Sequence, residues 1–295
     1  MYKRCILCPR ECRVNREKGE LGFCGLSNNI KIARADLHYW EEPCISGESG
    51  SGTVFFSGCN MKCVFCQNYD ISTLNKGYNI TVEKLSDIFL KLQYKGANNI
   101  NLVTPTHFVY DIIKALDIAK GKGLTIPIVY NSGGYEKVDT LKMLKGYIDI
   151  YIPDMKYFSD KYSIEYSSAK NYFNIAKDAV CEMVKQVGSP LFDKNGIMTK
   201  GVIVRHLMLP YLLFDSKKII DYLYDTYKDD IFISLMSQYT PTDNVCKVKR
   251  LNRNLSPKHY ETMIEYIEYK GIKNVYIQGT ESATKEYIPE FFYED

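Results

Sequence analysis

The sequence predicts an α/β fold made of parallel strand–helix–strand units. Two observations lead to this class. Short β-branched or aromatic runs recur along the chain, and a helical pattern follows each of them. Such units form either a doubly wound sheet or an open barrel, and periodicity alone does not choose between the two. In both architectures ligands bind at the carboxyl ends of the strands, so candidate functional residues are expected there.

The first half of the chain begins with a strand or hairpin arm over 31–39 and a buried strand over 53–58, which reads TVFFSG. Apolar residues at i, i+3, i+4 and i+7 from Leu85 predict a helix over 80–95, and Gly96 ends it. The elements that follow are a strand at 99–104, a helix at 111–120, a strand at 126–131 and a helix at 138–145.

The second half continues the alternation with longer elements. Residues 159–187 read as one long helical segment. Ser256 is the expected N-cap of a late helix, with Pro257 at its first position and Gly271 after its end. The remaining elements are strands at 148–152, 202–207, 231–236 and 274–278, and a helix at 216–228.

Composition excludes several classes of protein. The chain has 295 residues, of which 45% are hydrophobic and 25% charged, so it is neither disordered, collagen-like nor a coiled coil. A net charge of +3 gives no reason to expect nucleic acid or a membrane surface as partner. The N-terminus has no apolar run typical of a signal peptide, and no stretch approaches a membrane span, so we expect a cytoplasmic protein.

The ten cysteines are distributed unevenly, because eight of them lie within the first 66 residues. A reducing cytoplasm disfavours disulfides, and a chain of this length buries a full core without them. Clustered cysteines therefore indicate metal or cluster ligands. The eight are Cys5, Cys8, Cys12, Cys24, Cys44, Cys59, Cys63 and Cys66.

Cys59, Cys63 and Cys66 follow the first buried strand directly, in a C-x3-C-x2-C spacing. A loop at the carboxyl end of a strand can curl three thiolates around one soft metal centre, such as zinc or an iron–sulfur cluster. A four-iron cluster normally takes four cysteines, so three ligands leave one iron open. An open coordination position is typical of a working centre.

With Phe65 just before the third cysteine, this loop resembles the radical SAM superfamily. The stretch GSGTVFFSGCNMKCVFCQN is most similar to an uncharacterised branch related to the activating enzyme of pyruvate formate-lyase, a glycyl radical enzyme. The resemblance covers about residues 51–280 and implies a partial (β/α)6 TIM-type barrel. It divides the chain into a small Cys-rich metal-binding extension at 1–50 and a barrel at 51–295.

The resemblance implies a 4Fe–4S cluster that, when reduced, cleaves S-adenosylmethionine (SAM) to a 5′-deoxyadenosyl radical. That radical abstracts hydrogen, and the first candidate substrate is a glycine of a glycyl radical enzyme. The alternatives are a peptide or small-molecule substrate and, more remotely, a non-catalytic zinc-binding interaction protein. An electron donor such as flavodoxin or ferredoxin is the expected partner.

The resemblance also implies roles for individual residues. Cys59, Cys63 and Cys66 match the cluster ligands and are the catalytic residues it implies. A Gly-Gly-Glu run of the family is replaced here by TPTH at 104–107, so the acid is missing and the two threonines are the candidate acceptors. A structural salt bridge is the competing interpretation of the arginine in strand 202–207. The implied SAM-binding residues are Phe65, Asn68, Thr104, Thr106, Ser132, Asp154, Lys156 and Arg205.

A second set of cysteines lies ahead of the barrel, in the spacing C-x2-C-x3-C-x11-C. Four thiolates complete a tetrahedral shell, which both zinc and an iron–sulfur cluster accept. We therefore expect a second metal centre of either type, with free thiols as the alternative. Its ligands would be Cys5, Cys8, Cys12 and Cys24, and Cys44 is a spare candidate.

Overall fold

The computed structural model describes residues 2–246 and 248–279. A sheet runs through the molecule, and its parallel strands follow one another in chain order. These strands are β2 (Ser51–Phe56), β4 (Ile100–Val103), β5 (Ile128–Ser132), β6 (Ile150–Pro153), β8 (Met198–Leu207), β9 (Phe232–Met236) and β10 (Val275–Ile277).

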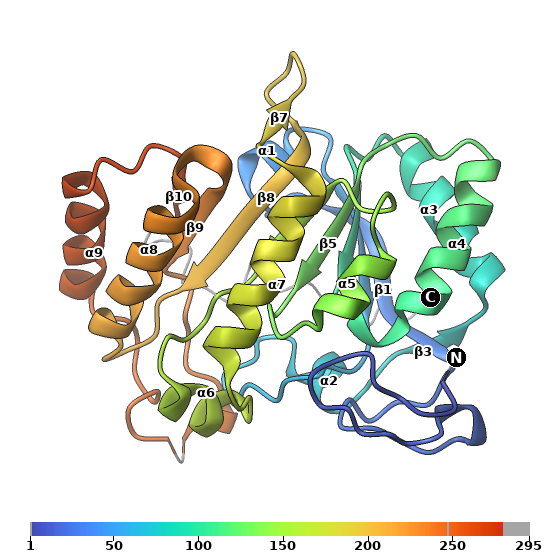
Figure 1. The fold of residues 1–295 in the computed structure, drawn as a ribbon, viewed down its shortest axis with the longest axis horizontal. Coiled ribbons are helices and arrows are strands. Elements are labelled where there is room, and N and C mark those ends of the chain that lie inside the picture. Colours follow the sequence, from blue (N-terminus) through green and yellow to red (C-terminus); the bar gives the residue numbers. More distant parts are fainter. Residues whose placement is uncertain (1, 247, 280–295) are drawn as a thin grey trace.

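Sequential strand order decides between the two architectures that the sequence left open. A doubly wound sheet reverses its order at a switch point, whereas this order runs one way, so right-handed crossovers place the helices on one face. Figure 1 shows that row of helices in front of the sheet, as in a partial barrel. The row consists of α3 (Val82–Tyr94), α4 (Val109–Gly121), α5 (Val138–Met143), α7 (Tyr172–Val187), α8 (Leu213–Tyr227) and α9 (Pro257–Tyr269).

Two antiparallel strands extend the sheet beyond β2. β1 (Ile30–His38) pairs with β2, and β3 (Tyr78–Ile80) pairs with β1. β1 is the arm expected at 31–39, and its pairing joins this part of the 1–50 extension to the barrel sheet. A two-residue strand, β7 (Leu191–Phe192), forms a hairpin with the start of β8. The expected barrel domain, 51–295, ends in residues 280–295, which lie outside the described residues.

A short helix fills the inner face of the barrel at the amino ends of the strands. α1 (Pro43–Ser46) buries Cys44 and Ile45 against residues that begin the central strands, among them Val129, Ile150 and Met198. Asn99, at the start of β4, donates a hydrogen bond to the Ile45 carbonyl at 2.8 Å. Cys44 therefore packs as a small apolar residue here and is no spare ligand for either cysteine set.

The long helical segment expected over 159–187 is two helices, α6 (Asp160–Ser167) and α7. Ser168 and Asn171 between them have φ angles of 52° and 53°, in the left-handed region. The Asp160 carboxylate accepts the backbone N–H groups of Asn171 and Tyr172, both at 3.1 Å, and so fixes the break. Because no glycine or proline marks this position, the sequence pattern did not predict it.

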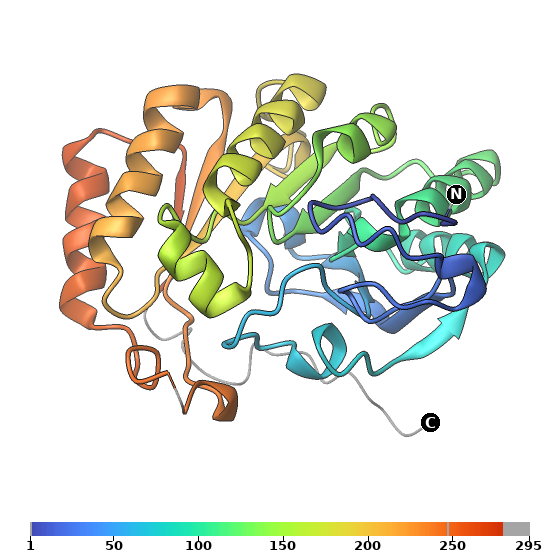
Figure 2. The same ribbon diagram turned by 60° about the horizontal axis from the view of Figure 1, so that its bottom comes forward.

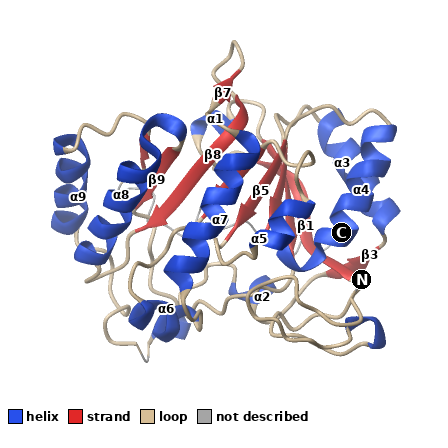
Figure 3. Cartoon of the chain, viewed as in Figure 1, coloured by secondary structure: helices blue, strands red, loops and turns tan. Residues whose placement is uncertain are grey.

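Residues 2–29 contain no strand, and their one regular turn is a 3-10 helix at Arg16–Lys18 (Figure 3). They lie at the carboxyl ends of the strands, beside α2 (Tyr69–Ser72). Figure 2 shows them over the half of the barrel that carries α4 and α5. The Leu7 carbonyl accepts the Thr140 hydroxyl, and the Tyr2 hydroxyl donates to Asp111 on α4. Among the described residues, no helix is both long and apolar enough to cross a membrane.

Candidate active site

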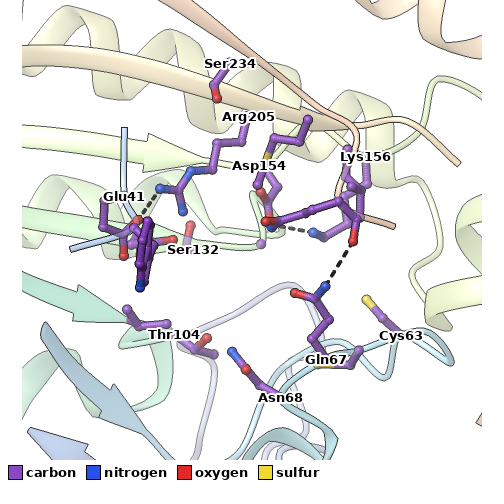
Figure 4. Close-up of a pocket in the computed structure, with 18 of the residues that line it drawn as sticks. Glu41, Cys63, Gln67, Asn68, Thr104, Ser132, Asp154, Lys156, Arg205 and Ser234 are labelled. Carbon is purple, nitrogen blue, oxygen red and sulfur yellow. Dashed lines mark hydrogen bonds and ion pairs between the residues drawn. The ribbon is translucent and has the colours of Figure 1, made fainter. Parts of the chain in front are cut away.

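A cavity of about 490 Å³ lies inside the barrel at the carboxyl ends of the strands. This volume lies within the usual range of small-molecule sites. Its walls come from the loop after β2, from the ends of β4, β5, β6, β8 and β9, and from the segment between β1 and α1. Figure 4 shows side chains from these elements pointing into one space.

Cys59, Cys63 and Cys66 all line this cavity. Their loop is held against the end of α6, where the Tyr166 carbonyl accepts the Val64 N–H at 2.8 Å. Each sulfur also has a polar neighbour. The backbone N–H of Met61 lies 3.3 Å from the Cys59 sulfur, the Ser167 hydroxyl donates to Cys63 at 2.9 Å, and the Ser72 hydroxyl is 3.2 Å from Cys66.

The three thiols suit a positively charged, polynuclear centre. Burial raises the pKa of all three, that of Cys63 to about 11, so they stay protonated unless a metal centre replaces the proton. In residues 2–246 and 248–279, no three His, Cys, Asp or Glu side chains are gathered closely enough for a single metal ion. Three thiols on one cavity wall, each with a polar neighbour at its sulfur, are a donor set that fits an iron–sulfur cluster.

Ser167 is a polar neighbour that the sequence pattern did not reveal. It is wholly buried, and its hydroxyl bridges the Tyr157 hydroxyl, at 2.6 Å, and the Cys63 sulfur. Hydrogen bonds to ligand sulfurs raise the reduction potential of iron–sulfur clusters. We therefore expect Ser167→Ala to lower the potential of the reconstituted cluster by an amount on the order of tens of millivolts.

Potentiometric titration followed by electron paramagnetic resonance measures this shift. Ser49→Ala, at an exposed position remote in sequence, is the control and should leave the potential unchanged. An unchanged potential in Ser167→Ala would show that this hydroxyl does not act on the cluster.

Asp154 and Lys156 follow β6 and face the cavity together. The Lys156 ammonium donates to the Asp154 carboxylate at 2.5 Å, and the two side chains are 15% and 23% exposed, in that order. Burial acts to lower the pKa of Lys156, but Asp154 and the nearby thiols outweigh it and hold that pKa above its usual value. Lys156 therefore presents a fixed positive charge to the cavity, where it can bind a carboxylate.

Ser132 is the last residue of β5, and Gly133 and Gly134 form a tight turn directly after it. A Cβ on Gly133 would meet the Met61 sulfur at 2.9 Å, and one on Gly134 would meet the Asp154 carbonyl oxygen at 2.0 Å. Gly134 also has a φ of +74°, in the left-handed region that glycine adopts without the steric cost of a side chain. The turn thereby lies against the end of β6 and leaves Ser132 on the cavity wall.

We expect Gly134→Ala to lower the free energy of unfolding by at least about 2 kcal/mol, since it adds a backbone clash to a left-handed conformation. Gly121→Ala is a matched control, because a Cβ there meets nothing within 4 Å. Anaerobic urea denaturation compares the two variants, and equal stability would contradict this account of the turn.

The two candidate threonines have different surroundings. Thr104 lines the cavity, with a φ of 57° that turns the chain at the end of β4. After this turn Thr106 faces away, and its hydroxyl donates to Glu136 at 2.7 Å. Thr106 is buried and does not line the cavity, so the structure corrects its expected place there.

Glu136 is a buried carboxyl group that the sequence analysis missed. It gathers the hydroxyl groups of Thr106, Tyr130 and Ser132. Burial raises its pKa to about 7 even though these hydroxyl groups favour the charged form. Its position behind Ser132 fixes the orientation of that side chain at the cavity wall.

Arg205 has carboxylate partners from a distant part of the chain. Its Nε and Nη2 donate to Glu42 at 2.7 and 2.5 Å, and Nη2 also donates to Glu41. This is the structural salt bridge that competed with a SAM-binding role, and Arg205 still lines the cavity. Glu41 and Glu42 line it too and were not predicted, because no motif marks the segment between β1 and α1.

Phe65 and Asn68 also reach the cavity, as the resemblance implied. Phe65 is buried and packs edge-on against Tyr239, with ring centroids 6.0 Å apart. Asn68 points toward the interior from the end of the cysteine loop (Figure 4). Of the expected SAM-binding residues, all but Thr106 are therefore brought together around one cavity.

Three of the four N-terminal cysteines have, like the cavity triplet, a polar donor at the sulfur. Backbone N–H groups donate to their sulfurs: that of Phe23 to Cys12 at 3.2 Å, and those of Arg10 and Leu26 to Cys8 and Cys24. Such donors stabilise thiolates. Burial raises the pKa of Cys8 to about 12, and the neighbouring cysteines add to it, so the free thiols would not ionise by themselves.

Arg10 ties this segment to the cavity loop. Its Nε donates to the carbonyl of Asn60, beside Cys59, at 2.8 Å, and its Nη1 donates to the carbonyl of Ser168 at 2.6 Å. The guanidinium group also lies 3.7 Å from the ring centroid of Phe23. The N-terminal cysteine segment is thus packed directly against the loop that holds the triplet.

Comparison with known proteins agrees with a barrel that carries a three-cysteine loop after its first parallel strand. The family model of the radical SAM superfamily matches residues 53–200. The protein MJ0674 of Methanocaldococcus jannaschii is 31% identical over 94% of this chain and 78% of its own length. The chain belongs to the radical SAM superfamily, whose members take a 4Fe–4S cluster and SAM.

Solved structures show the same fold at low sequence identity. A radical SAM methyltransferase from Sphaerobacter thermophilus superposes with a TM-score of 0.52 and 13% identity, over 79% of this chain and 69% of that one. SuiB of Streptococcus suis, solved with bound S-adenosylmethionine, superposes with a TM-score of 0.51 and 14% identity over 75% of this chain. The match covers only about half of SuiB, 48% of its length.

Proposed function

We propose that this chain abstracts a hydrogen atom from a substrate held inside its barrel, using a 4Fe–4S cluster on Cys59, Cys63 and Cys66. One observation carries the proposal: these three thiols share a single cavity with the Asp154–Lys156 pair. With SAM bound, the cluster supplies a 5′-deoxyadenosyl radical.

The chain's own residues bind and orient the cofactor in this proposal. Lys156 binds the carboxylate of SAM, and its pairing with Asp154 fixes the ammonium in place. Thr104 and Ser132 offer oxygen acceptors to the amino group of SAM. Phe65 would lie beside the adenine of SAM, and the Asn68 side chain would offer SAM a hydrogen bond from the end of the cysteine loop.

The first candidate substrate is a glycine of a glycyl radical enzyme, with flavodoxin or ferredoxin as electron donor. The resemblance of the cysteine loop to the activating enzymes supports it. The second candidate is a peptide or small molecule with a polar side group. The Glu41–Glu42–Arg205 cluster on the cavity wall favours the second, because a glycine has no side chain that would engage it.

Deuterium transfer separates the candidates. Glycyl radical enzymes labelled at glycine, and peptides labelled at other positions, are incubated with the reduced, SAM-loaded protein. Label in 5′-deoxyadenosine identifies the donor of the hydrogen atom. Deoxyadenosine that gains deuterium from neither class would contradict both candidates.

We also propose that Cys5, Cys8, Cys12 and Cys24 hold a second metal centre, either an iron–sulfur cluster or zinc, for which the four sulfurs would have to draw closer together on binding. The N–H groups that donate to three of these sulfurs support it. We expect Cys8→Ser to lose that metal while the triplet keeps its cluster.

Metal analysis after anaerobic reconstitution identifies the centre. A loss of half the iron indicates a second cluster, and a loss of zinc alone indicates a zinc site. Cys246→Ser, at an exposed cysteine, is the control. Unchanged iron and zinc in Cys8→Ser would show that this set binds no metal.

A further inference from the structure

The end of the cavity away from the thiols has its own chemistry. Glu41 and Glu42 come from the segment between β1 and α1, and Arg205 comes from β8; their side chains are 8%, 6% and 12% exposed. Figure 4 shows Glu41 and Arg205 on one side of the cavity, and Cys63 and Lys156 on the other. We call the side that holds Glu41, Glu42 and Arg205 the inner end.

The inner end has an excess of negative charge. Two carboxylates face one guanidinium, and although burial opposes ionisation of Glu42, Arg205 holds its pKa below the usual value, so it stays charged. The neighbouring His38 adds no positive charge, since burial lowers its pKa. A buried negative charge without a counter-ion is costly, which indicates a cation supplied from outside.

The other charged side chains of this region are already paired with each other. Arg34, on β1, lies 3.9 Å from Asp36, and Asp36 also pairs with Lys95 at 2.8 Å. Across the cavity, Asp154 pairs with Lys156. Within the described residues, the ion-pair partner of both Glu41 and Glu42 is Arg205.

Asn101 gives an independent indication of a missing donor. It is wholly buried on β4, and its Nδ2 donates to Glu41 Oε1 at 2.9 Å. Its Oδ1 is buried without a hydrogen-bond partner among the described residues. Asn101 does not line the cavity itself, but Glu41 does, so a donor that binds beside Glu41 would also come close to this unpaired oxygen. An ammonium has three donors and no acceptor, and a guanidinium has five.

Aromatic side chains line the same end. Trp40, Phe55 and Tyr276 all contribute to the cavity wall. Aromatic faces attract cations, and the attraction grows when the cation leaves water. Carboxylates and aromatic rings together select an organic cation rather than a hydrated metal ion, which takes oxygen ligands alone.

We propose that the inner end binds a positively charged amino or guanidino group of the substrate, held by Glu41 and Glu42 and covered by Trp40. This rests on the proposed function, because it takes the substrate to lie between the inner end and the SAM site. The carbon that loses hydrogen then belongs to an amine, to a basic side chain of a peptide, or to a peptide residue next to a basic residue.

Trp40 is the single tryptophan of the chain, so its fluorescence reports on this site. Reconstituted, SAM-loaded protein is titrated with acetyl-Gly-Lys-Gly-amide and with acetyl-Gly-norleucine-Gly-amide, which lacks the ammonium group. We expect a saturable change with the lysine peptide, and at least tenfold weaker binding of the norleucine peptide. Equal affinities, or no binding of the lysine peptide, would overturn the proposal.

Variants of two glutamates in the same segment make the test specific. Glu41→Gln should lower the affinity for the lysine peptide at least tenfold. Glu48→Gln, at an exposed position, should leave that affinity unchanged. SAM affinity is measured in parallel by equilibrium dialysis. If Glu41→Gln lowers the affinity for SAM as much as the affinity for the peptide, the Glu41 carboxylate binds the cofactor and the proposal is wrong.

A second variant guards against misfolding of Glu41→Gln. Trp40 is 63% exposed, so Trp40→Leu should fold, and calorimetry replaces fluorescence as the readout. We expect Trp40→Leu to bind the lysine peptide several-fold more weakly and to bind SAM as before. Unchanged affinity for the lysine peptide would contradict the role of Trp40. Formation of 5′-deoxyadenosine in the absence of peptide tests the proposed function separately. If the protein forms deoxyadenosine but does not bind the lysine peptide, the inference about the inner end is wrong and the proposed function stands.

Discussion

Replacing Cys63 with alanine is expected to remove the iron–sulfur absorbance of the anaerobically reconstituted protein and to abolish 5′-deoxyadenosine formation. The reason is geometric. Cys63 lines the cavity between Cys59 and Cys66 and is held by Ser167, so its loss leaves only two thiols on that wall. Two cysteines do not hold a four-iron cluster.

The matched control is Cys181→Ala, which changes an exposed cysteine on α7. We expect it to keep the iron content, the visible spectrum and deoxyadenosine formation of the unmodified chain. Iron content that is unchanged in Cys63→Ala would show that the ligand assignment is wrong. A chain that stays colourless and binds only zinc would instead support the non-catalytic alternative.

Replacing Lys156 with methionine is expected to weaken SAM binding by about 2 kcal/mol or more, roughly 30-fold in the dissociation constant. The substitution removes the fixed positive charge of the cavity and leaves Asp154 to repel the SAM carboxylate. The apolar stem is conserved, so the packing changes little. Equilibrium dialysis with labelled SAM measures the effect.

Lys145→Met is the control, because Lys145 is exposed and follows α5 on the surface. Its SAM affinity should equal that of the unmodified chain. Affinity that is unchanged in Lys156→Met as well would show that the carboxylate of SAM lies elsewhere. The cluster spectrum must stay intact in both variants, since Lys156 is expected to bind the cofactor and not the iron.

Much of the fold was predictable from the sequence because its strands are short, apolar and bounded by glycine. The expected strand over 53–58 overlaps β2, and the alternation after it holds through β10. The break between α6 and α7 was missed because it depends on Asp160, a surface side chain that caps backbone groups eleven and twelve residues later. Local patterns do not reveal such a contact.

The site was predictable where a motif marks it. The cysteine loop, the Asp154–Lys156 pair and the turn after Ser132 all reach the cavity. Thr106 was misplaced because the left-handed conformation of Thr104 redirects the chain toward Glu136. Glu41 and Glu42 were missed because their partner, Arg205, lies more than 160 residues away in the sequence.

The family assignment makes the general chemistry clear and leaves the substrate to this chain's own residues. Radical SAM enzymes share the cluster and SAM. In this chain the two ends of the cavity differ in the charge of the side chains that line them. The thiol end carries the Lys156 charge, and the inner end carries an excess of carboxylate. We expect substrate selection to depend on the carboxylates of the inner end.

The most direct test of the central claim is anaerobic incubation of the reconstituted protein with SAM and a strong reductant, followed by chromatography of the products. We predict that the protein is brown and that it forms 5′-deoxyadenosine and methionine in equal amounts. Protein that holds a full cluster and binds SAM, yet forms no deoxyadenosine when reduced, would contradict the proposed function.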